Sequence, residues 1–195
     1  MGIIVPDDLD ENKFLNYLFY RQQLSDKCLV TYLIYSTECN FACEYCYEMG
    51  HGQQRKMSEE KFNELVEWYK QKIIHGGISE CQIVLFGGEP LLNVSVFLKL
   101  LETIKTIAES NNVVLSTKII TNGYLLNKGF IDSMQAYNLK EIQVTIDGTP
   151  QYHDKLRHLK NGVGTFNKVF ANLLKTSSHS TGITFLCRIL NSAHL

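Results

Sequence analysis

The sequence predicts an α/β fold with a parallel sheet, and two observations support that prediction. Five apolar, β-branched segments alternate with four amphipathic helical patterns at a period of about 30–40 residues, which is typical of successive βαβ units. The first four of these segments each end in glycine or polar residues, and ligands of parallel α/β folds collect at the carboxyl ends of strands. We therefore expect one composite site along one edge of the sheet.

The individual elements follow from the hydrophobic pattern. The expected strands are rich in apolar and β-branched residues and cover Leu29–Ser36, Gln82–Phe86, Val113–Thr121, Glu141–Ile146 and Ile183–Leu190. The expected helices share an apolar stripe and run from Ser58 to His75, Val94 to Ser110, Asn127 to Tyr137 and Thr165 to Lys175. The polar stretch between Asp147 and Thr165 is expected to be a loop.

The domain organisation is expected to be simple. No stretch of the 195 residues has the composition of a linker, so we expect one core domain at residues 28–195. Residues 1–27 are expected to form a lead-in with a short helix over Asp10–Leu24 that leans on the core.

Composition and charge exclude several classes of function. The net charge is −1 and no block of lysine and arginine occurs, which argues against nucleic acid or an anionic membrane as partner. Apolar runs are far shorter than the roughly 20 residues that span a bilayer, and we find no signal-peptide pattern. Three of the six cysteines, Cys28, Cys81 and Cys187, are scattered among apolar residues and are expected to be buried thiols. A reducing, cytoplasmic location fits this cysteine usage best.

The other three cysteines form the most informative motif of the sequence, Cys39-Asn-Phe-Ala-Cys43-Glu-Tyr-Cys46. Thiolates are soft ligands that select iron–sulfur clusters, zinc or cuprous copper. Three thiolates are one short of the four that close a structural zinc site or fill every iron of a 4Fe–4S cluster. The motif therefore indicates either a cluster with one open iron or a zinc site completed by His51.

Glycine-bearing motifs end the next three predicted strands: Gly87-Gly88-Glu89-Pro90, Asn122-Gly123 and Asp147-Gly148. Two glycines let the backbone approach a ligand closely, and Glu89 can accept hydrogen bonds from an ammonium group. Each motif alone is usually a turn. Their order along successive strand ends is what indicates a shared site. His153-Asp154, in the predicted loop, could either act in acid–base chemistry or hold a turn.

Taken together, CNFACEYC, GGEP, ITNG, and VTIDGTPQYHD with the following GVGTF resemble the radical S-adenosylmethionine (radical SAM) enzymes. The likeness runs from about Leu29 to Leu190 and is greatest to the SPASM-type branch that matures proteins and peptides, such as the anaerobic sulfatase maturases. It implies a partial (β/α)6 TIM-like barrel with parallel strands. This chain would contribute the first five strands and stop after the fifth.

The resemblance also implies roles for individual residues. Cys39, Cys43 and Cys46 would bind three irons of a 4Fe–4S cluster, and S-adenosylmethionine would bind the fourth. The remaining candidates would contact S-adenosylmethionine: Tyr45 near the adenine, Gly87, Gly88 and Glu89 at the methionine amino group, Asn122 in the TNG motif, Thr145 and Asp147 near the ribose, and Arg157 or Arg188 at the carboxylate.

The resemblance further implies an activity and partners. Reductive cleavage of S-adenosylmethionine would give a 5′-deoxyadenosyl radical that abstracts hydrogen from a peptide or protein substrate. A flavodoxin or ferredoxin would donate the electron.

Two departures from the family keep alternatives open. The chain lacks the sixth βα unit and the cysteine-rich C-terminal extension that would hold auxiliary clusters. We therefore expect a fragment of a longer maturase. The alternatives are a non-catalytic iron–sulfur or zinc-binding module, and a radical SAM enzyme that acts on a small molecule.

Overall fold

The computed structural model describes Lys13 and residues 27–47, 55–177 and 184–189, the last range by its backbone. The predicted lead-in helix, His51 and most of the lead-in lie outside these residues. The described strands form one five-stranded sheet in the order β1-β2-β3-β4-β5, and every neighbouring pair is parallel. The predicted parallel α/β fold is therefore confirmed.

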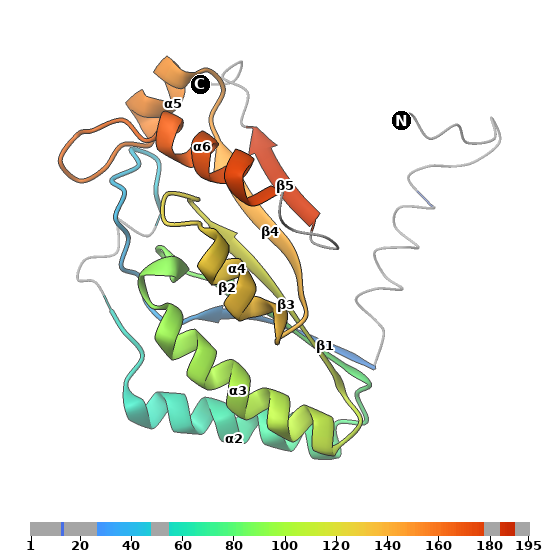
Figure 1. Cartoon of the computed structure of the whole chain (residues 1–195). Helices are drawn as coiled ribbons and strands as arrows, with labels where there is room; N and C mark the ends of the chain where they lie inside the picture. The colour runs from blue at the N-terminus through green and yellow to red at the C-terminus, as the bar shows by residue number, and fades with distance from the viewer. Residues whose placement is uncertain (1–12, 14–26, 48–54, 178–183, 190–195) are drawn as a thin grey trace, which may run out of the picture.

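The elements alternate as the hydrophobic pattern predicts (Figure 1). The strands are β1 (Cys28–Ile34), β2 (Glu80–Phe86), β3 (Val114–Thr121), β4 (Leu139–Ile146) and β5 (Thr184–Ile189). The helices are α2 (Glu59–His75), the 3-10 turn η2 (Pro90–Leu92), α3 (Val94–Ser110), α4 (Lys128–Gln135), α5 (Pro150–Leu156) and α6 (Phe166–Ser177). Figure 1 shows the long helices α2 and α3 side by side along one face of the sheet.

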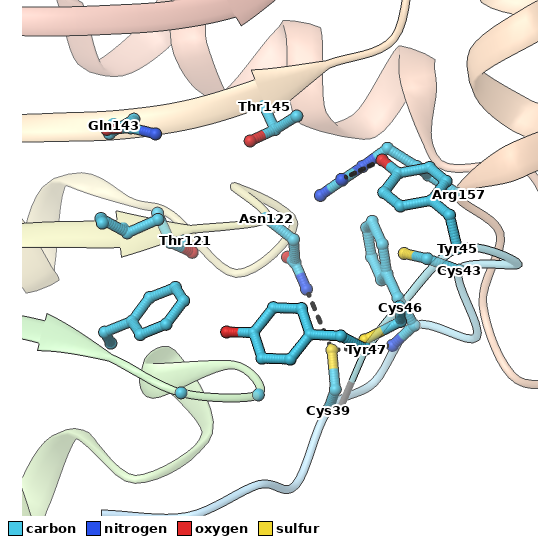
Figure 2. Close-up of a pocket in the computed structure, with 15 residues that line it drawn as sticks. Cys39, Cys43, Tyr45, Cys46, Tyr47, Thr121, Asn122, Gln143, Thr145 and Arg157 are labelled. Carbon is cyan, nitrogen blue, oxygen red and sulfur yellow. Dashed lines mark hydrogen bonds between the residues drawn. The ribbon is translucent and has the colours of Figure 1, made fainter. Parts of the chain in front are cut away.

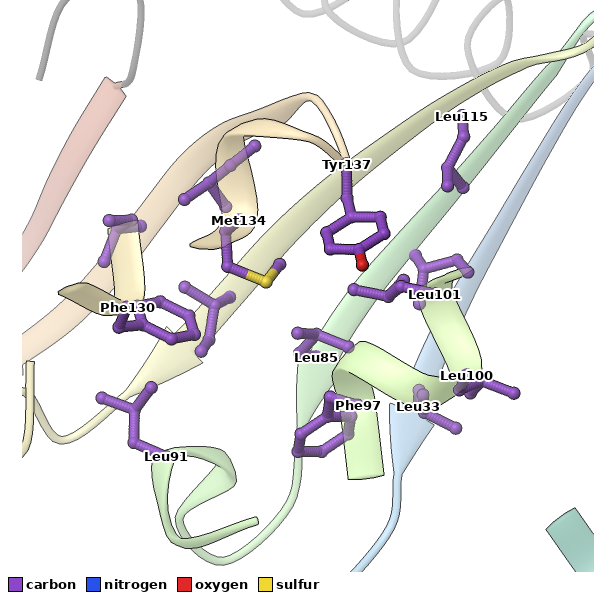
Figure 3. Close-up of a cluster of buried hydrophobic side chains, with 14 of the residues drawn as sticks. Leu33, Leu85, Leu91, Phe97, Leu100, Leu101, Leu115, Phe130, Met134 and Tyr137 are labelled. Atoms are coloured by element: carbon purple, nitrogen blue, oxygen red, sulfur yellow. The ribbon is translucent and has the colours of Figure 1, made fainter. Parts of the chain in front are cut away.

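The hydrophobic core lies between that face and the helices (Figure 3). Alternate strand residues point into it, including Ile83, Leu85, Ile119 and Ile142, because successive side chains of a strand face opposite sides. The space opposite these strands is filled by Phe97 and Leu101 of α3 and Met134 of α4. Figure 3 shows these three side chains around Leu85 of β2. This packing fixes the sheet and thereby the positions of the loops that follow its strands.

The opposite face of the sheet is more open and more polar. On β1, Tyr32 is 66% exposed and Val30 is also exposed. Across the strands, Gln82 Nε2 donates a hydrogen bond to Ser116, and Lys118 pairs with Glu141 at 3.6 Å. In a closed barrel this face would line the interior.

The sequence prediction was wrong about the stretch between Asp147 and Thr165, which is not all loop. Pro150–Leu156 forms helix α5, which begins with proline at its first turn, where the missing N–H costs nothing. The helix is too short to show a hydrophobic period in the sequence. His153 and Asp154 therefore stand on a helix rather than in a loop.

Two further comparisons concern cysteines and membranes. Of the scattered cysteines, Cys81 is fully buried as predicted, whereas Cys28 at the start of β1 is only partly buried. Within the described ranges, no helix combines the length and the apolar character needed to cross a bilayer.

Candidate functional site

A cavity of about 340 Å³ opens at the carboxyl ends of β1 to β4, a volume within the range of about 300–1,000 Å³ that is typical of small-molecule sites. Figure 2 shows its lining side chains arriving from the cysteine loop, from β3 and β4, and from the segment around Arg157. Of the predicted site residues, the cavity is lined by Cys39, Cys43, Tyr45, Cys46, Gly87, Gly88, Asn122, Thr145 and Arg157. The tertiary structure thus brings four sequence motifs to one site.

The cysteine loop, residues 39–46, is held from inside by Phe41. The Phe41 side chain is 1% exposed and packs edge-to-face against Tyr124, with ring centroids 5.9 Å apart. Its backbone N–H donates to the Cys39 sulfur at 3.4 Å, and Asn122 Nδ2 donates to the same sulfur at 3.7 Å. Hydrogen bonds of this kind stabilise negative charge on a thiolate.

The thiols themselves lie in a poorly solvated setting. Burial raises the pKa of Cys43 to about 11, although the positive charge of Arg157 opposes the shift. Burial also raises the pKa of Cys39, and the hydrogen bonds from Phe41 and Asn122 oppose it. At neutral pH these thiols are protonated, so a metal that binds them must displace protons, and its affinity will rise with pH.

Two glycines bring the loop after β2 against the loop after β1. Gly87 has a φ of 128°, a conformation that side-chain-bearing residues rarely adopt, and a Cβ there would lie 2.5 Å from the Ser36 carbonyl oxygen. A Cβ on Gly88 would lie 2.2 Å from the carbonyl oxygen of Glu38. The sequence predicted that these glycines let the backbone approach a ligand, whereas the close approach in the structure is to the backbone of residues 36–38.

Glu89 occupies a different position from its glycine neighbours. Its side chain is 1% exposed and does not line the cavity. The carboxylate accepts hydrogen bonds from Leu91 N at 2.9 Å, the Thr121 hydroxyl at 2.7 Å and Asn122 N at 2.7 Å. Burial raises the pKa of Glu89, and these donors oppose the shift. The carboxylate therefore joins the end of β2 to the end of β3 beneath the cavity.

Glu89→Gln is expected to destabilise the protein by about 1–3 kcal/mol, since a glutamine amide turns its NH2 group toward a backbone N–H in either orientation. Chemical denaturation would measure the change. The control is Glu64→Gln on the exposed surface of α2, for which we expect less than about 0.5 kcal/mol. Equal stability of the two variants would contradict the bridging role of Glu89.

A buried polar network connects the cysteine loop to β4 and α5. The Tyr45 hydroxyl donates a hydrogen bond to Asp147 Oδ2 and accepts one from Arg157 Nη1 at 2.7 Å. Burial and the bond to Asp147 raise the pKa of Tyr45 to about 12. Within the described residues, Asp147 Oδ1 and Arg157 Nε are buried without a hydrogen-bond partner. Buried polar atoms normally have partners, so the network around the cavity-lining residue Arg157 is incompletely satisfied by the described part of the chain.

The chain as a whole matches a known family. The model of the radical SAM superfamily matches residues 33–187. This chain belongs to the radical SAM superfamily. The family predicted from the ordered motifs is therefore confirmed, and so are the cofactors that radical SAM enzymes use, a 4Fe–4S cluster and S-adenosylmethionine.

Two curated radical SAM relatives are anaerobic sulfatase maturases. The chain is 32% identical over 146 residues to a serine-type anaerobic sulfatase-maturating enzyme from Bacteroides thetaiotaomicron, covering 70% of this chain and 34% of the relative. It is 26% identical over 141 residues to a cysteine-type enzyme from Clostridium novyi, covering 71% of this chain and 37% of the relative. The chain thus spans only about a third of the length of these relatives.

A solved structure shares the fold. The chain aligns with native anSMEcpe with bound AdoMet and Kp18Cys peptide at a TM-score of 0.66 and 23% identity, covering 82% of this chain and 42% of that one. The fold of this chain is therefore part of the TIM-like barrel of radical SAM enzymes.

The residues present fit the radical SAM cofactors. Three thiols line one cavity, N–H donors reach one of their sulfurs, and among the described residues the buried Arg157 Nε has no hydrogen-bond partner. Within the part of the chain that the structure describes, no three His, Cys, Asp or Glu side chains converge on one metal-ion position.

Some predicted site residues lie away from the cavity, and some lining residues were missed. Asp147 and Glu89 are buried behind its wall, and Arg188 pairs with Thr145 in the sheet register, although its side chain is outside the described set. The lining residues that were not among the predicted site residues are Phe41, Tyr47, Phe86, Ile120, Thr121 and Gln143. Gln143 could have been found, because it lies two residues before Thr145 and therefore on the same face of β4.

Proposed function

We propose that this chain is the S-adenosylmethionine-cleaving core of an enzyme that modifies a peptide or protein. The observation that best supports this is that Cys39, Cys43, Cys46 and Arg157 line one cavity at the carboxyl ends of the strands. When bound, the cluster and S-adenosylmethionine supply a 5′-deoxyadenosyl radical that removes a hydrogen atom from an unactivated C–H bond.

The residues of the chain would divide the work as follows. Cys39, Cys43 and Cys46 would bind three irons, while the hydrogen bonds from Phe41 and Asn122 would tune the cluster through the Cys39 sulfur. The backbone of Gly87 and Gly88, which borders the cavity, would hold the methionine amino group. Glu89 would act through its bonds to Thr121 and Asn122 rather than by touching the cofactor.

The other end of the cavity would bind the rest of S-adenosylmethionine. Arg157 would take the carboxylate role, since it carries a guanidinium and lines the cavity. The side chain of Arg188 lies outside the described residues. Tyr45 would lie at the adenine and Thr145 at the ribose, and Asp147 would position Tyr45 through their hydrogen bond.

The peptide or protein substrate is proposed because the sulfatase-maturating relatives, and the peptide-bound anSMEcpe structure, belong to enzymes with that kind of substrate. Reduction of the cluster would need a one-electron donor such as a flavodoxin or ferredoxin. We propose a reducing, cytoplasmic location, because three of the six cysteines are clustered as candidate metal ligands and the other three are scattered among apolar residues.

The test of the proposed function is anaerobic iron and sulfide analysis with electron paramagnetic resonance, before and after S-adenosylmethionine is added. We expect about four irons per chain and a spectrum that shifts with the cofactor. Formation of 5′-deoxyadenosine with candidate peptides would then separate a peptide substrate from a small molecule. A protein without iron, or a cluster indifferent to S-adenosylmethionine, would refute the proposal.

Arg157→Lys is expected to weaken S-adenosylmethionine binding by about tenfold or more while the cluster is retained. Lysine keeps the charge but lacks the planar set of donors that can bind a carboxylate with two parallel hydrogen bonds. Anaerobic equilibrium dialysis on variants matched for iron content would measure the affinity. Arg55→Lys, at an exposed position outside the cavity, is the control. Unchanged affinity in the Arg157 variant would remove this residue from the proposed site.

A further inference from the structure

The cysteine loop is held on its outer side by a segment more than 100 residues later in the chain, Leu156–Lys160, which we name the clamp segment. Ala42 N donates to the His158 carbonyl at 2.9 Å, and Glu44 N donates to the Leu156 carbonyl at 3.2 Å. Lys160 N donates back to the Asn40 carbonyl at 3.3 Å, and Phe41 and Leu159 form an antiparallel bridge. Together these contacts make a short antiparallel ladder between two irregular segments.

The loop that contains the clamp segment is closed at its base by Asp154. The Asp154 Oδ1 atom accepts hydrogen bonds from Thr165 N and Phe166 N, each at 2.7 Å. A carboxylate here satisfies the free N–H groups at the start of α6 from outside that helix. The fourth predicted helix, α6, therefore begins at Phe166, directly after Thr165, and the capping side chain is Asp154 of α5 rather than Thr165.

Capping by Asp154 leaves the Thr165 hydroxyl free for another task. The hydroxyl donates to the Arg157 carbonyl and contacts His153 Nε2 at 3.1 Å. His153 Nδ1 accepts a hydrogen bond from Asp147 N at 3.2 Å, so Nε2 carries the proton and the ring is neutral. Asp154 thus fixes Thr165, and Thr165 fixes the backbone where the clamp segment begins.

Gly164 provides the space that this closure needs. A Cβ at Gly164 would lie 2.5 Å from the Asp154 carboxyl carbon and from Oδ2. Its φ is not in the left-handed region, so the requirement is for space and not for an unusual backbone conformation.

We propose that Asp154 is a positioning residue for the iron site: by closing the loop of the clamp segment, it holds the cysteine loop in its cluster-binding shape. The part of this inference that concerns iron rests on the proposed function. The part that concerns the cysteine loop does not, because it can be tested on protein without a cluster.

The first test is amide hydrogen exchange of the cluster-free protein carrying Asp154→Ala. We expect exchange at Ala42 and Glu44 to become about tenfold faster, with exchange in β2 and β3 unchanged. After reconstitution, removal of iron by a chelator should also become about tenfold faster. Asp132→Ala, which removes a half-exposed carboxylate from α4, is the control and should change neither rate.

Two further variants separate positioning from general damage. Asp154→Asn should restore slow exchange, because one amide oxygen can accept both hydrogen bonds that Oδ1 accepts. As a single substitution, Gly164→Ala should make exchange at Ala42 and Glu44 faster, because the new Cβ would collide with the Asp154 carboxyl group. In protein that already carries Asp154→Ala, that carboxyl group is gone and Gly164→Ala should add little.

Two results would overturn the role proposed for Asp154. If Asp154→Ala frees only the amides of Thr165 and Phe166, Asp154 merely caps α6 and the proposal is overturned. An asparagine variant that exchanges as fast as the alanine variant would also overturn it. If the protein does not bind iron but Asp154→Ala still speeds exchange at Ala42 and Glu44, the role of Asp154 in holding the cysteine loop is supported while the proposed function fails.

Discussion

Replacing Cys43 with alanine is expected to abolish the iron–sulfur cluster. The remaining two thiols, Cys39 and Cys46, cannot hold a cluster that needs three protein ligands to leave one iron open. Iron content should fall from about four per chain to well below one, and the visible absorbance of the reconstituted protein should disappear. Iron analysis and absorbance spectroscopy after anaerobic reconstitution would measure both changes.

The matched control is Cys81→Ala. This thiol, on strand β2, is fully buried in the hydrophobic core and does not line the cavity. Burial raises its pKa to about 12, and burial also raises the pKa of Cys43, so the position of Cys81 away from the cavity is what separates it from the proposed ligands. Its replacement should leave the cluster intact at a small cost in stability. Loss of the cluster from both variants would mean that the ligands have been assigned wrongly.

Replacing Gly88 with alanine is expected to destabilise the protein by about 3 kcal/mol or more, because the new Cβ meets backbone atoms that cannot rotate away. The Cβ would lie 2.2 Å from the Glu38 carbonyl oxygen and 2.5 Å from that of Thr37. Since Glu38 directly precedes Cys39, relief of the collision must move the cysteine loop. Denaturant unfolding would measure the loss in free energy of unfolding. After reconstitution, the folded fraction of the Gly88 variant should hold less iron than the unaltered protein.

The control for this change is Gly129→Ala in α4, where the nearest atom to a Cβ is the Asn127 side-chain oxygen at 3.2 Å. Alanine inside a helix should cost nothing or stabilise the protein by up to about 1 kcal/mol. A Gly88 variant as stable as this control would show that the two loops can separate without loss. The close approach would then not be needed for the site.

The proposed iron site would depend on contacts at two sides of the cysteine loop. Gly88 sets the approach of the β2 loop on one side, and the clamp segment pairs with the cysteine loop on the other. Tyr45 adds a third connection through Arg157 and Asp147. A cluster site needs its ligands held by several contacts, because a small displacement of one ligand weakens its bond to the cluster.

Much of this organisation was determined by the sequence alone. The family followed from the resemblance of the ordered motifs to a known family. The alternation of strands and helices and the gathering of motifs at one edge of the sheet followed from local periodicity and from the position of short motifs. These are properties of neighbouring residues. They specify which face of an element is buried and where each strand ends, and parallel connection then brings the strand ends together.

Only the tertiary structure decided how the individual polar groups are used. In the folded chain the Glu89 carboxylate joins the ends of β2 and β3, Asp154 caps α6, and Arg157 lines the cavity. It also made helix α5 from a stretch too short to show a period, and paired Leu156–Lys160 with the cysteine loop. The physical reason is that a buried polar atom must find a partner wherever the packed chain provides one, and no local pattern encodes a partner that is far away in sequence.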